Sequence, residues 1–471
     1  EKNDDVGGTW YENTYPGCRV DVPNHFYSYS CAQRDDWPSV FSTQQVLLDY
    51  FRSVADEFGL RESIRFETEV TEAVFDEETC QWTLALRTAD GGRETLEANA
   101  IVCGVGQLNR PVLPDIPGRD DFEGPSFHSA RWDDRVELRG KRVAIIGTGA
   151  SAAQFIPPVA DMASELFVFQ RTPPWILPTP DNRSEVPEGQ QFLMRHVPWF
   201  AQWYRFWLFW TMSEGLLPMA RVEDGWPHPE RSVGEGNEQI RNVFLEVLRA
   251  QCAGDDELYR KLAPDYPPLS KRFVRDDGLL VRTLGRDDVD LVTDPIERIT
   301  PTGLRTKSGR DVDVDVIVYG TGFSASKFLV PMKVVGRGGR DLHQHWAGDA
   351  RAYLGITVPH FPNLFLMYGP NTNIVVNGSI IYFSECEANY IVDCIRELLE
   401  SGRRALDCKP AVHDAYNRRI DAENLRMAWG AATVNTWYRN EKGRISQNWP
   451  STLLAYWQQT RAVDPADYEW L

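Results

Sequence analysis

Several features that define protein classes are missing from this sequence. Its eight cysteines form no CxxC pair, which argues against a zinc or thioredoxin-type site and favours reduced thiols in a cytoplasmic protein. No apolar run approaches the roughly 20 residues of a membrane-spanning helix, so stable membrane insertion is not expected. Asp and Glu number 68 against 50 Lys and Arg, giving a net charge of -18. That acidic balance argues against a nucleic-acid partner, which needs a positively charged surface.

The chain is too long for one hydrophobic core. With 471 residues, of which 42% are hydrophobic and 25% charged, it is expected to fold into two or three globular domains. Its most apolar segment, residues 199–212 (WFAQWYRFWLFWTM), is short and is interrupted by Arg205. We expect this segment to be a buried aromatic helix. The wall of a substrate tunnel and a contact with a membrane surface are the alternatives.

Strand and helix signals alternate along the chain. Apolar residues at helical spacing predict helices over residues 41–60, 150–162 and 385–399, and a helix-rich segment over 190–262. Short apolar or alternating runs predict strands over residues 64–75, 82–87, 100–105, 141–146, 166–169, 289–292 and 313–319. A proline-rich connector at 110–118 marks a domain boundary. The strand–helix–strand order over residues 141–169 is that of a parallel sheet.

A glycine loop directly follows the predicted strand at 141–146 and opens the next helix. It consists of Gly147, Thr148, Gly149, Ala150, Ser151 and Ala152. The first glycine allows a tight turn, and the second lets the backbone approach a pyrophosphate at the helix N-terminus. The small third residue lets helix and strand pack closely. In this context the loop predicts a dinucleotide-binding site.

The end of the next predicted strand indicates which dinucleotide binds. An NAD site has Asp or Glu at this point, to bond the ribose 2′-hydroxyl. Here the strand ends in Arg171 and Thr172. Because a guanidinium pairs well with a 2′-phosphate, we expect NADPH rather than NADH. The alternative for Arg171 is a solvated surface residue.

Two further signatures lie outside the glycine loop. One is FxGxxxHxxxW followed by Asp, formed by Phe122, Gly124, His128, Trp132 and Asp133. The other is GGxWxxxxYPGxxxD, which covers residues 7–21 and matches at every fixed position. On these motifs the chain resembles the Baeyer–Villiger monooxygenases, a family of flavoproteins. Segments 226–231 and 265–268 make it most similar to the subgroup acting on aryl ketones such as hydroxyacetophenones.

The resemblance implies a catalytic arginine. In this family reduced FAD captures O2 as a C4a-peroxyflavin, whose anion attacks a ketone and gives an ester or lactone. Arg272 matches the arginine that stabilises this negative oxygen, a task that requires a fixed cation. Asp21 matches the carboxylate that holds the arginine near the flavin. Without the family context, Lys271 and Arg272 would read as an ordinary surface pair.

The remaining contacts with the cofactors also follow from the resemblance. For FAD they are Glu1, Gly8, Thr9, Trp10, Asp21, Tyr27, Val70 and Asn371. For NADP they are the glycine-loop residues with Arg171, Thr172, Lys271 and Trp437. His128 would lie in the linker between the two nucleotide domains and affect their coupling, with a structural histidine as the alternative. Residues 316–323 (VIVYGTGF) are similar to the stretch where the family's chain returns to the FAD domain.

The implied fold is α/β, with two Rossmann-like dinucleotide-binding domains and a helical insertion. Residues 1–130 and 321–471 would form the FAD domain. Residues 131–320 would form the NADP domain, with the insertion at about 190–262. The first β-strand and the GxGxxG loop of the FAD domain are missing before Glu1. We therefore expect a chain trimmed from a longer reading frame, with weak or absent FAD binding.

The implied function is insertion of one oxygen atom of O2 next to the carbonyl of a small-molecule ketone. FAD and NADPH are the expected cofactors, a homodimer is an expected assembly, and no metal site is expected. Two alternatives remain open. One is a flavin monooxygenase that oxygenates nitrogen or sulfur, against which Trp132 and Asp21 argue. The other is a non-catalytic remnant that binds NADP at most.

Overall fold

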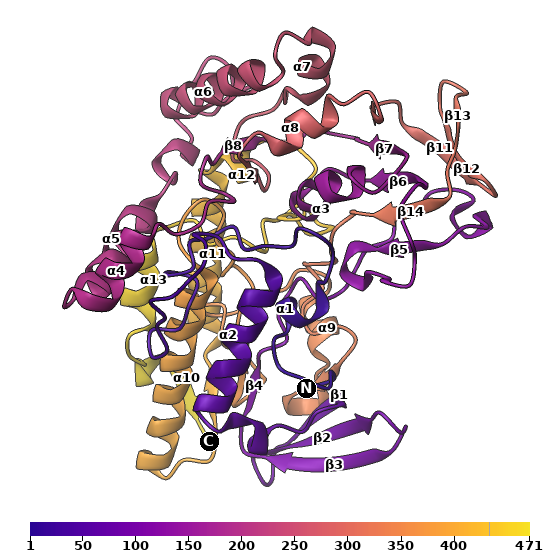
Figure 1. Cartoon of the computed structure of the whole chain (residues 1–471). Helices are drawn as coiled ribbons and strands as arrows, with labels where there is room; N and C mark the ends of the chain where they lie inside the picture. The colour runs from indigo at the N-terminus through magenta and orange to yellow at the C-terminus, as the bar shows by residue number, and fades with distance from the viewer. Residues whose placement is uncertain (433) are drawn as a thin grey trace.

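The computed structural model describes residues 1–432 and 434–471 (Figure 1). The upper part of Figure 1 contains a five-stranded sheet with the strand order β10-β7-β6-β14-β5, in which every pairing is parallel. Its strands are β5 (Ser126–His128), β6 (Arg142–Ile146), β7 (Glu165–Phe169), β10 (Val289–Val292) and β14 (Val316–Tyr319). Helix α3 (Ala150–Ala160) connects β6 to β7, as the sequence predicts.

Both faces of this sheet are covered, which explains the continuous apolar runs of its central strands. Helices α3 and α8 (Leu279–Leu284) pack together on one face. The other face carries a three-stranded antiparallel sheet made of β11 (Ile296–Thr300), β12 (Gly303–Thr306) and β13 (Asp311–Asp313). Ile299 and Leu304 of this small sheet are buried in one cluster with Phe167 and Ile317.

Segments from the two ends of the chain pair in the lower part of Figure 1. Strand β15 (Lys333–Val335) pairs parallel with β1 (Thr68–Asp76), which continues into the antiparallel strands β2 (Gln81–Thr88) and β3 (Arg93–Ala98). Likewise β16 (Leu364–Leu366) pairs parallel with β4 (Ile101–Cys103). Strands β17 (Leu406–Cys408) and β18 (Tyr468–Trp470) pair antiparallel. Residues before 104 and after 332 therefore build one body.

Helices pack around this lower body. The longest, α10 (Ile380–Ser401), contains the predicted helix at 385–399 and packs on α13 (Leu453–Thr460), where the rings of Phe383 and Tyr456 stack at 4.1 Å. Helix α2 (Gln44–Glu57) lies within the predicted helix at 41–60. The other helices here are α1 (Thr9–Glu12), α9 (Leu342–Trp346), α11 (Pro410–Leu425) and α12 (Ala428–Ala431).

The helix-rich segment contains α4 (Glu188–His196), α5 (Phe200–Glu214), α6 (Glu235–Gln251) and α7 (Asp256–Leu262). The expectation that residues 199–212 form a buried aromatic helix is wrong. Trp199 is 71% exposed, Trp203 67% and Trp210 68%. Helix α5 carries aromatic residues on two sides, but only one side packs against the core, the side that includes Leu208 and Phe209. The aromatic residues of the other side therefore remain exposed.

The predicted strand at 313–319 is divided in the structure. Its first residue ends β13, and residues 316–319 form β14 in the other sheet. The break lies at Val314, whose N–H donates to Thr302 O, and Asp315, whose N–H donates to Arg142 O at 2.8 Å. In the described part of the chain, no helix combines the length and apolarity needed to cross a membrane.

Candidate active site

The centre of the candidate site is an ion pair between two segments far apart in the sequence. Asp21 lies in the loop after α1, and Arg272 lies just before β9 (Val274–Asp276). The Nη2 group of Arg272 donates to Oδ2 of Asp21, and its Nη1 group donates to the carbonyl oxygen of Val375 at 3.4 Å. The side chains of Arg272 and Asp21 are 28% and 32% exposed. The pair is therefore fixed by the protein and still accessible from outside.

Neighbouring charges keep both members of this pair ionised. Burial tends to raise the pKa of Asp21, but the positive charges of Arg272 and Arg275 outweigh it and leave that pKa below its usual value. Burial tends to lower the pKa of Arg272, and the Asp21 carboxylate reverses this, so that its pKa is raised. Two guanidinium groups thus face one carboxylate. The local charge is positive, which suits a negatively charged oxygen.

Tyrosines surround the ion pair. Tyr27, Tyr368 and Tyr438 all lie close enough to Asp21 for its charge to raise their pKa values further, after the larger effect of burial. The hydroxyl of Tyr27 accepts a hydrogen bond from the indole N–H of Trp10 at 3.2 Å. The ring of Trp437 contacts that of Tyr438 at 4.6 Å. The structure thus brings three predicted cofactor residues, Trp10, Tyr27 and Trp437, to the surroundings of the pair.

The predicted dinucleotide loop lies between β6 and α3. Gly147 has a φ of 110°, and a Cβ atom there would lie 2.5 Å from the carbonyl oxygen of Gly320. Only glycine fits this turn, because the segment with Gly320 crosses directly beside it. A Cβ at Gly149 would meet nothing within 4 Å, so its side is open. Ala152 is fully buried and packs α3 against the sheet.

Two cations lie together near this loop. The pKa of Lys271 is lowered, first by burial and then by the positive charge of Arg171. The ammonium group of Lys271 lies 4.9 Å from the ring centre of Tyr266. Arg171 and Thr172 lie in the segment that follows β7, and Thr172 is partly buried. Like charges repel, so this arrangement favours an anion between them, such as a phosphate.

The residues of the FxGxxxHxxxW signature lie where the two bodies of the chain connect. His128 ends β5, its Nδ1 accepts from Ala130 N–H at 3.1 Å, and its ring lies 5.7 Å from that of Phe323. Burial is the main cause that lowers the pKa of His128 to about 4, so the ring is neutral at pH 7. Trp132 packs on Phe127 and Phe155.

The other members of this signature have structural contacts. A Cβ at Gly124 would lie 2.5 Å from the carbonyl oxygen of Asp315, so a larger residue would clash with backbone. Phe122 packs against the cluster between the two sheets. Asp133 is bonded twice by the guanidinium of Arg135, both times at 2.8 Å. These contacts fix the entry of the chain into β6.

The predicted FAD residues fall into two groups. Gly8, Thr9 and Trp10 form the start of α1, close to Tyr27. Glu1 lies elsewhere: its carbonyl oxygen accepts from Thr68 N–H at 2.8 Å, two residues before Val70 in β1. Both segments belong to the body that the chain ends build.

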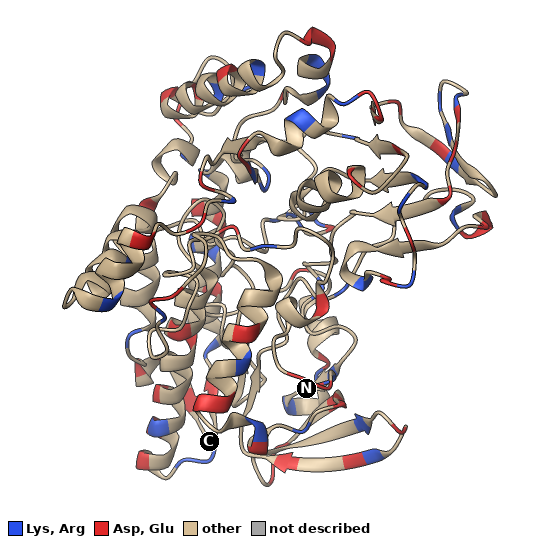
Figure 2. Ribbon diagram, in the orientation of Figure 1, with Lys and Arg blue, Asp and Glu red and all other residues tan. Residues whose placement is uncertain are grey.

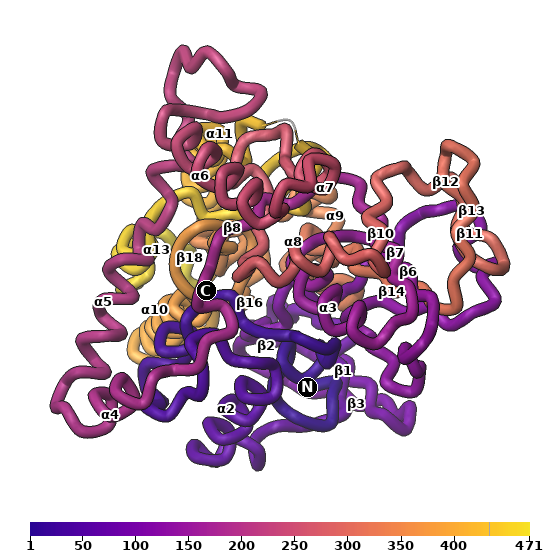
Figure 3. Tube along the Cα trace, turned by 45° about the horizontal axis from the view of Figure 1, so that its top comes forward, coloured from indigo at the N-terminus to yellow at the C-terminus, as the bar shows by residue number. Residues whose placement is uncertain are grey.

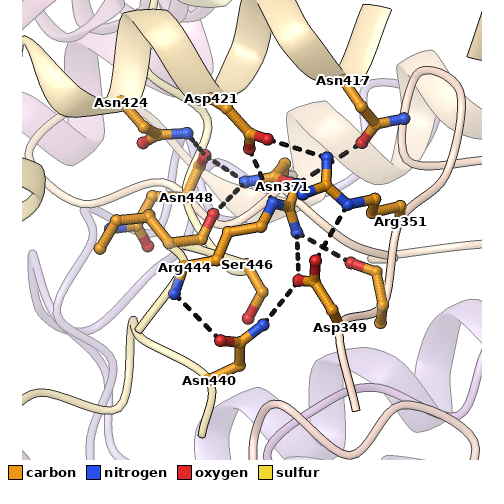
Figure 4. A network of polar contacts seen from close by, with 12 residues as sticks. Asp349, Arg351, Asn371, Asn417, Asp421, Asn424, Asn440, Arg444, Ser446 and Asn448 are labelled. Atoms are coloured by element: carbon orange, nitrogen blue, oxygen red, sulfur yellow. Dashed lines mark hydrogen bonds and ion pairs between the residues drawn. The ribbon is translucent and has the colours of Figure 1, made fainter. Parts of the chain in front are cut away.

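Asn371 lies in a loop held by a network of polar side chains (Figure 4). Its Nδ2 group donates to the carbonyl oxygens of Ile445 and Asn448, and its Oδ1 accepts from Arg444 at 2.6 Å. Arg444 is held in turn by Asp421 at 2.7 Å. The backbone N–H of Asn371 also donates, to Ser446 O at 3.0 Å. Because the side chain and the N–H are both used within the protein, this residue can meet a cofactor only through its backbone carbonyl group.

Several residues near the pair were not found from the sequence. The amide of Gln107 and the hydroxyl of Tyr438 are buried without a hydrogen-bond partner among the described residues. Glu387 is fully buried in α10, and its carboxyl accepts from Tyr368 N–H at 2.9 Å and from the Tyr456 hydroxyl at 3.3 Å. Of these residues, only Tyr438 was indicated by the sequence, because it directly follows Trp437, a predicted NADP residue. Within residues 1–432 and 434–471, no cluster of His, Cys, Asp and Glu is placed to hold a metal ion.

Comparisons with known proteins agree with these features. Residues 1–195 match the flavin-binding monooxygenase-like family. A Baeyer–Villiger monooxygenase of Streptomyces coelicolor is 36% identical over 474 residues, which cover 100% of this chain and 86% of that protein. Among solved structures, OTEMO in complex with FAD and NADP has a TM-score of 0.86 at 27% identity, covering 100% of this chain and 94% of the other.

A second solved structure is an oxidized steroid monooxygenase bound to NADP. It has a TM-score of 0.83 at 29% identity and covers 100% of this chain and 94% of the other. Another relative, a Baeyer–Villiger monooxygenase of Pseudomonas aeruginosa, is 34% identical over 469 residues, which cover 99% of this chain and 85% of that protein. The matches span both bodies of the molecule, so the chain is a member of the Baeyer–Villiger monooxygenases, within the flavin-binding monooxygenase-like proteins.

Proposed function

We propose that this chain inserts one oxygen atom of O2 beside the carbonyl of an aryl ketone, with Arg272 as the cation that stabilises negative charge on oxygen. One observation carries the proposal: the guanidinium of Arg272 pairs with the Asp21 carboxylate at an accessible site. FAD and NADPH are the cofactors, and a ketone and O2 are the substrates. The ketone, O2, NADPH and a proton give an ester, NADP and water.

Arg272 has donors to spare for this task. A guanidinium carries five N–H donors, and the bonds with Asp21 and Val375 use only the two terminal nitrogens. The Asp21 carboxylate fixes the position of the group before the reaction starts, so that little reorganisation is needed when negative charge develops on oxygen. The second cation, Arg275, keeps the site positive after Asp21 is counted.

The residues present fit NADP and supply part of a flavin site. The Gly147 turn and the open side of Gly149 leave room for a pyrophosphate at the start of α3. Lys271 and Arg171 offer two cations for the 2′-phosphate of NADP. Bound FAD, once reduced by NADPH, supplies the activation of O2. On the flavin side we assign Trp10, Tyr27 and the backbone carbonyl group of Asn371 to binding, and we assign Trp437 to the nicotinamide side.

The preference for an aryl ketone is supported by the rings near the ion pair. Tyr27, Tyr368 and Tyr438 lie close to the pair of Asp21 and Arg272, and aromatic rings favour aromatic ligands. The unpaired hydroxyl of Tyr438 is a donor for a polar group on such a substrate. A phenolic ketone, such as 4-hydroxyacetophenone, matches both properties.

We assign the body built by residues before 104 and after 332 to FAD binding and the body around the parallel sheet to NADP binding. The boundary expected at residue 130 lies too late in the chain, because β5 (Ser126–His128) pairs with β14 in that sheet. The pairing of β1 with β15 and of β4 with β16 supports an FAD domain built from both ends of the chain. The parallel sheet around β6 supports the NADP assignment. His128, buried against Phe323 where the chain passes between the two, acts as a positioning residue for the two domains.

We also propose that the protein is a homodimer. Its support is the exposed aromatic side of α5, which is unusual on the surface of a monomer.

The test is oxygenation of 4-hydroxyacetophenone by the FAD-loaded protein with NADPH. Mass spectrometry should detect 4-hydroxyphenyl acetate, in an amount that follows the NADPH consumed. Arg272→Ala should abolish the ester while NADPH oxidation continues and hydrogen peroxide forms. The matched control is Arg305→Ala, which removes an arginine that also pairs with an aspartate but lies on the small sheet. Full ester yield from Arg272→Ala would refute the role of this cation.

A further inference from the structure

Helices α4 and α5 carry an apolar surface that faces away from the protein. Its large side chains are 38% to 71% exposed and come from Phe192, Leu193, Val197, Trp199, Trp203, Phe206, Trp207 and Trp210. We call this surface the aromatic face. Figures 1 and 3 both show α4 and α5 at the edge of the molecule, so other helices do not cover this face.

The aromatic face is continuous. Residues 199, 203, 206, 207 and 210 have the spacing of one side of a helix. The ring of Phe206 lies 5.7 Å from that of Trp203 and 6.1 Å from that of Trp210. The six aromatic side chains alone expose roughly 700 Å² if a fully exposed ring presents about 200 Å². Apolar patches on monomers usually cover about 300 to 600 Å².

The face carries little charge. The charged side chains of α5 are Glu214 and Arg205, and Arg205 points inward, where it donates to His25 O at 2.7 Å. Those of α4 are Glu188 and Arg195, and Arg195 pairs with Asp35 at 3.6 Å. In Figure 2 most of the ribbon of α4 and α5 is tan, whereas blue and red positions are frequent elsewhere. A face with little charge allows two copies to meet despite a net charge of -18 on each chain.

We infer that the aromatic face binds the aromatic face of a second copy of this chain about a two-fold axis. A stable interface buries about 800 Å² on each partner, and the six aromatic side chains alone supply most of that area. Trp and Phe are enriched at the centres of such interfaces. A surface with little charge is complementary to itself, as a two-fold contact requires. An anionic membrane is a poor alternative, because the chain is strongly acidic.

The inner side of α5 connects this interface to the ion pair. Phe209 packs against Phe26, in the loop that begins at Asp21. After the C-terminal end of α5, Leu216 N–H donates to Val376 O, next to the Val375 carbonyl that accepts from Arg272. A second copy on the outer side would therefore support the helix that holds both halves of the pair.

This inference rests on the proposed homodimer. The mass of the FAD-loaded protein in solution tests it without any measurement of turnover, so its failure is distinct from failure of the proposed oxygenation. Light scattering after gel filtration should give twice 53.7 kDa for the unaltered chain. The variant Trp203→Glu with Trp210→Glu should raise the dimer dissociation constant about 100-fold or more, because carboxylates would be buried in the contact. Circular dichroism checks that the variant is folded.

The control variant, Leu399→Glu, places the same charge on an exposed apolar residue of α10 that is 79% exposed and lies outside the aromatic face. It should remain dimeric. A monomeric unaltered chain would overturn the inference, and so would a folded double variant that stays dimeric. A monomer that sediments with phosphatidylcholine vesicles, and no longer does so after the double substitution, would also overturn it and identify a lipid surface as the occupant.

Discussion

Substitution of Asp21 by Asn removes the charge that holds Arg272 while keeping the size of the side chain. The lost contact is a charge-assisted hydrogen bond at a site where both partners are about one-third exposed. Such a bond is worth about 1.5 to 3 kcal/mol, and water at the open side replaces part of it. If that free energy no longer helps to hold Arg272 against the negative oxygen, ester formation becomes about 10- to 100-fold slower.

The assay for Asp21→Asn separates two products of NADPH oxidation. We expect ester formed per NADPH to fall, hydrogen peroxide to rise, and NADPH consumption to change much less, because reduction of the cofactor does not require the pair. The matched control is Asp311→Asn, which also unpairs an arginine, Arg305, bonded at 2.7 and 2.9 Å on the small sheet. An unchanged ester yield in Asp21→Asn, or an equal loss in the control, contradicts the reasoning.

The same pair predicts a pH dependence. The pKa of Asp21 is lowered in the folded protein, so its carboxylate stays charged as pH falls and the pair is lost only below the ordinary Asp value of about 3.9. Ester formed per NADPH should therefore stay constant between about pH 8 and pH 5. A fall within that range, measured at saturating cofactor, would show that another group controls the step.

Three further outcomes are expected. Burial raises the pKa of Glu387 to about 8, whereas Glu in the unfolded chain loses its proton near about 4.3. Between these pH values the folded state holds one more proton than the unfolded state, so the free energy of unfolding falls as pH rises. Glu387→Gln should flatten this slope in denaturant titrations. Gly147→Ala should destabilise the protein by about 3 kcal/mol, because of positive φ and a clash with backbone. Gly140→Ala, at a similar φ of 72° but with open space, should cost about 1 kcal/mol. Arg171→Ala with Lys271→Met should raise the KM for NADPH about 100-fold or more and leave that for NADH nearly unchanged, in steady-state kinetics; equal effects on both coenzymes would exclude a 2′-phosphate site.

The parts of the fold that the sequence predicts are those where burial produces a clear pattern. Strand β10 (Val289–Val292) is found as predicted, and α3 begins at the predicted Ala150, because their apolar residues face one core. Strand β3 was not predicted, since five of its six residues are exposed and the segment is polar. For the same reason the hairpin of β11 and β12, with charged residues such as Arg298 and Arg305, gave no strand signal.

The same limit applies to the site. Asp21 and Arg272 lie 251 positions apart, and only the likeness to a family suggested that they meet. Gln107, Tyr368 and Glu387 carry no local pattern, because their importance arises from burial beside other segments. The aromatic segment at 199–212 was misread because composition alone cannot tell how many sides of a helix the core will cover.

The two segments that pass between the bodies are bonded to each other. Val112 N–H donates to Gly322 O at 2.9 Å, Ser324 N–H donates to Arg110 O at 2.9 Å, and Pro111 pairs with Phe323. Two strands joined in this way form a short ribbon. Such a ribbon bends out of its own plane more easily than its two strands slide past each other. Any relative movement of the two bodies is therefore guided toward bending in a single plane.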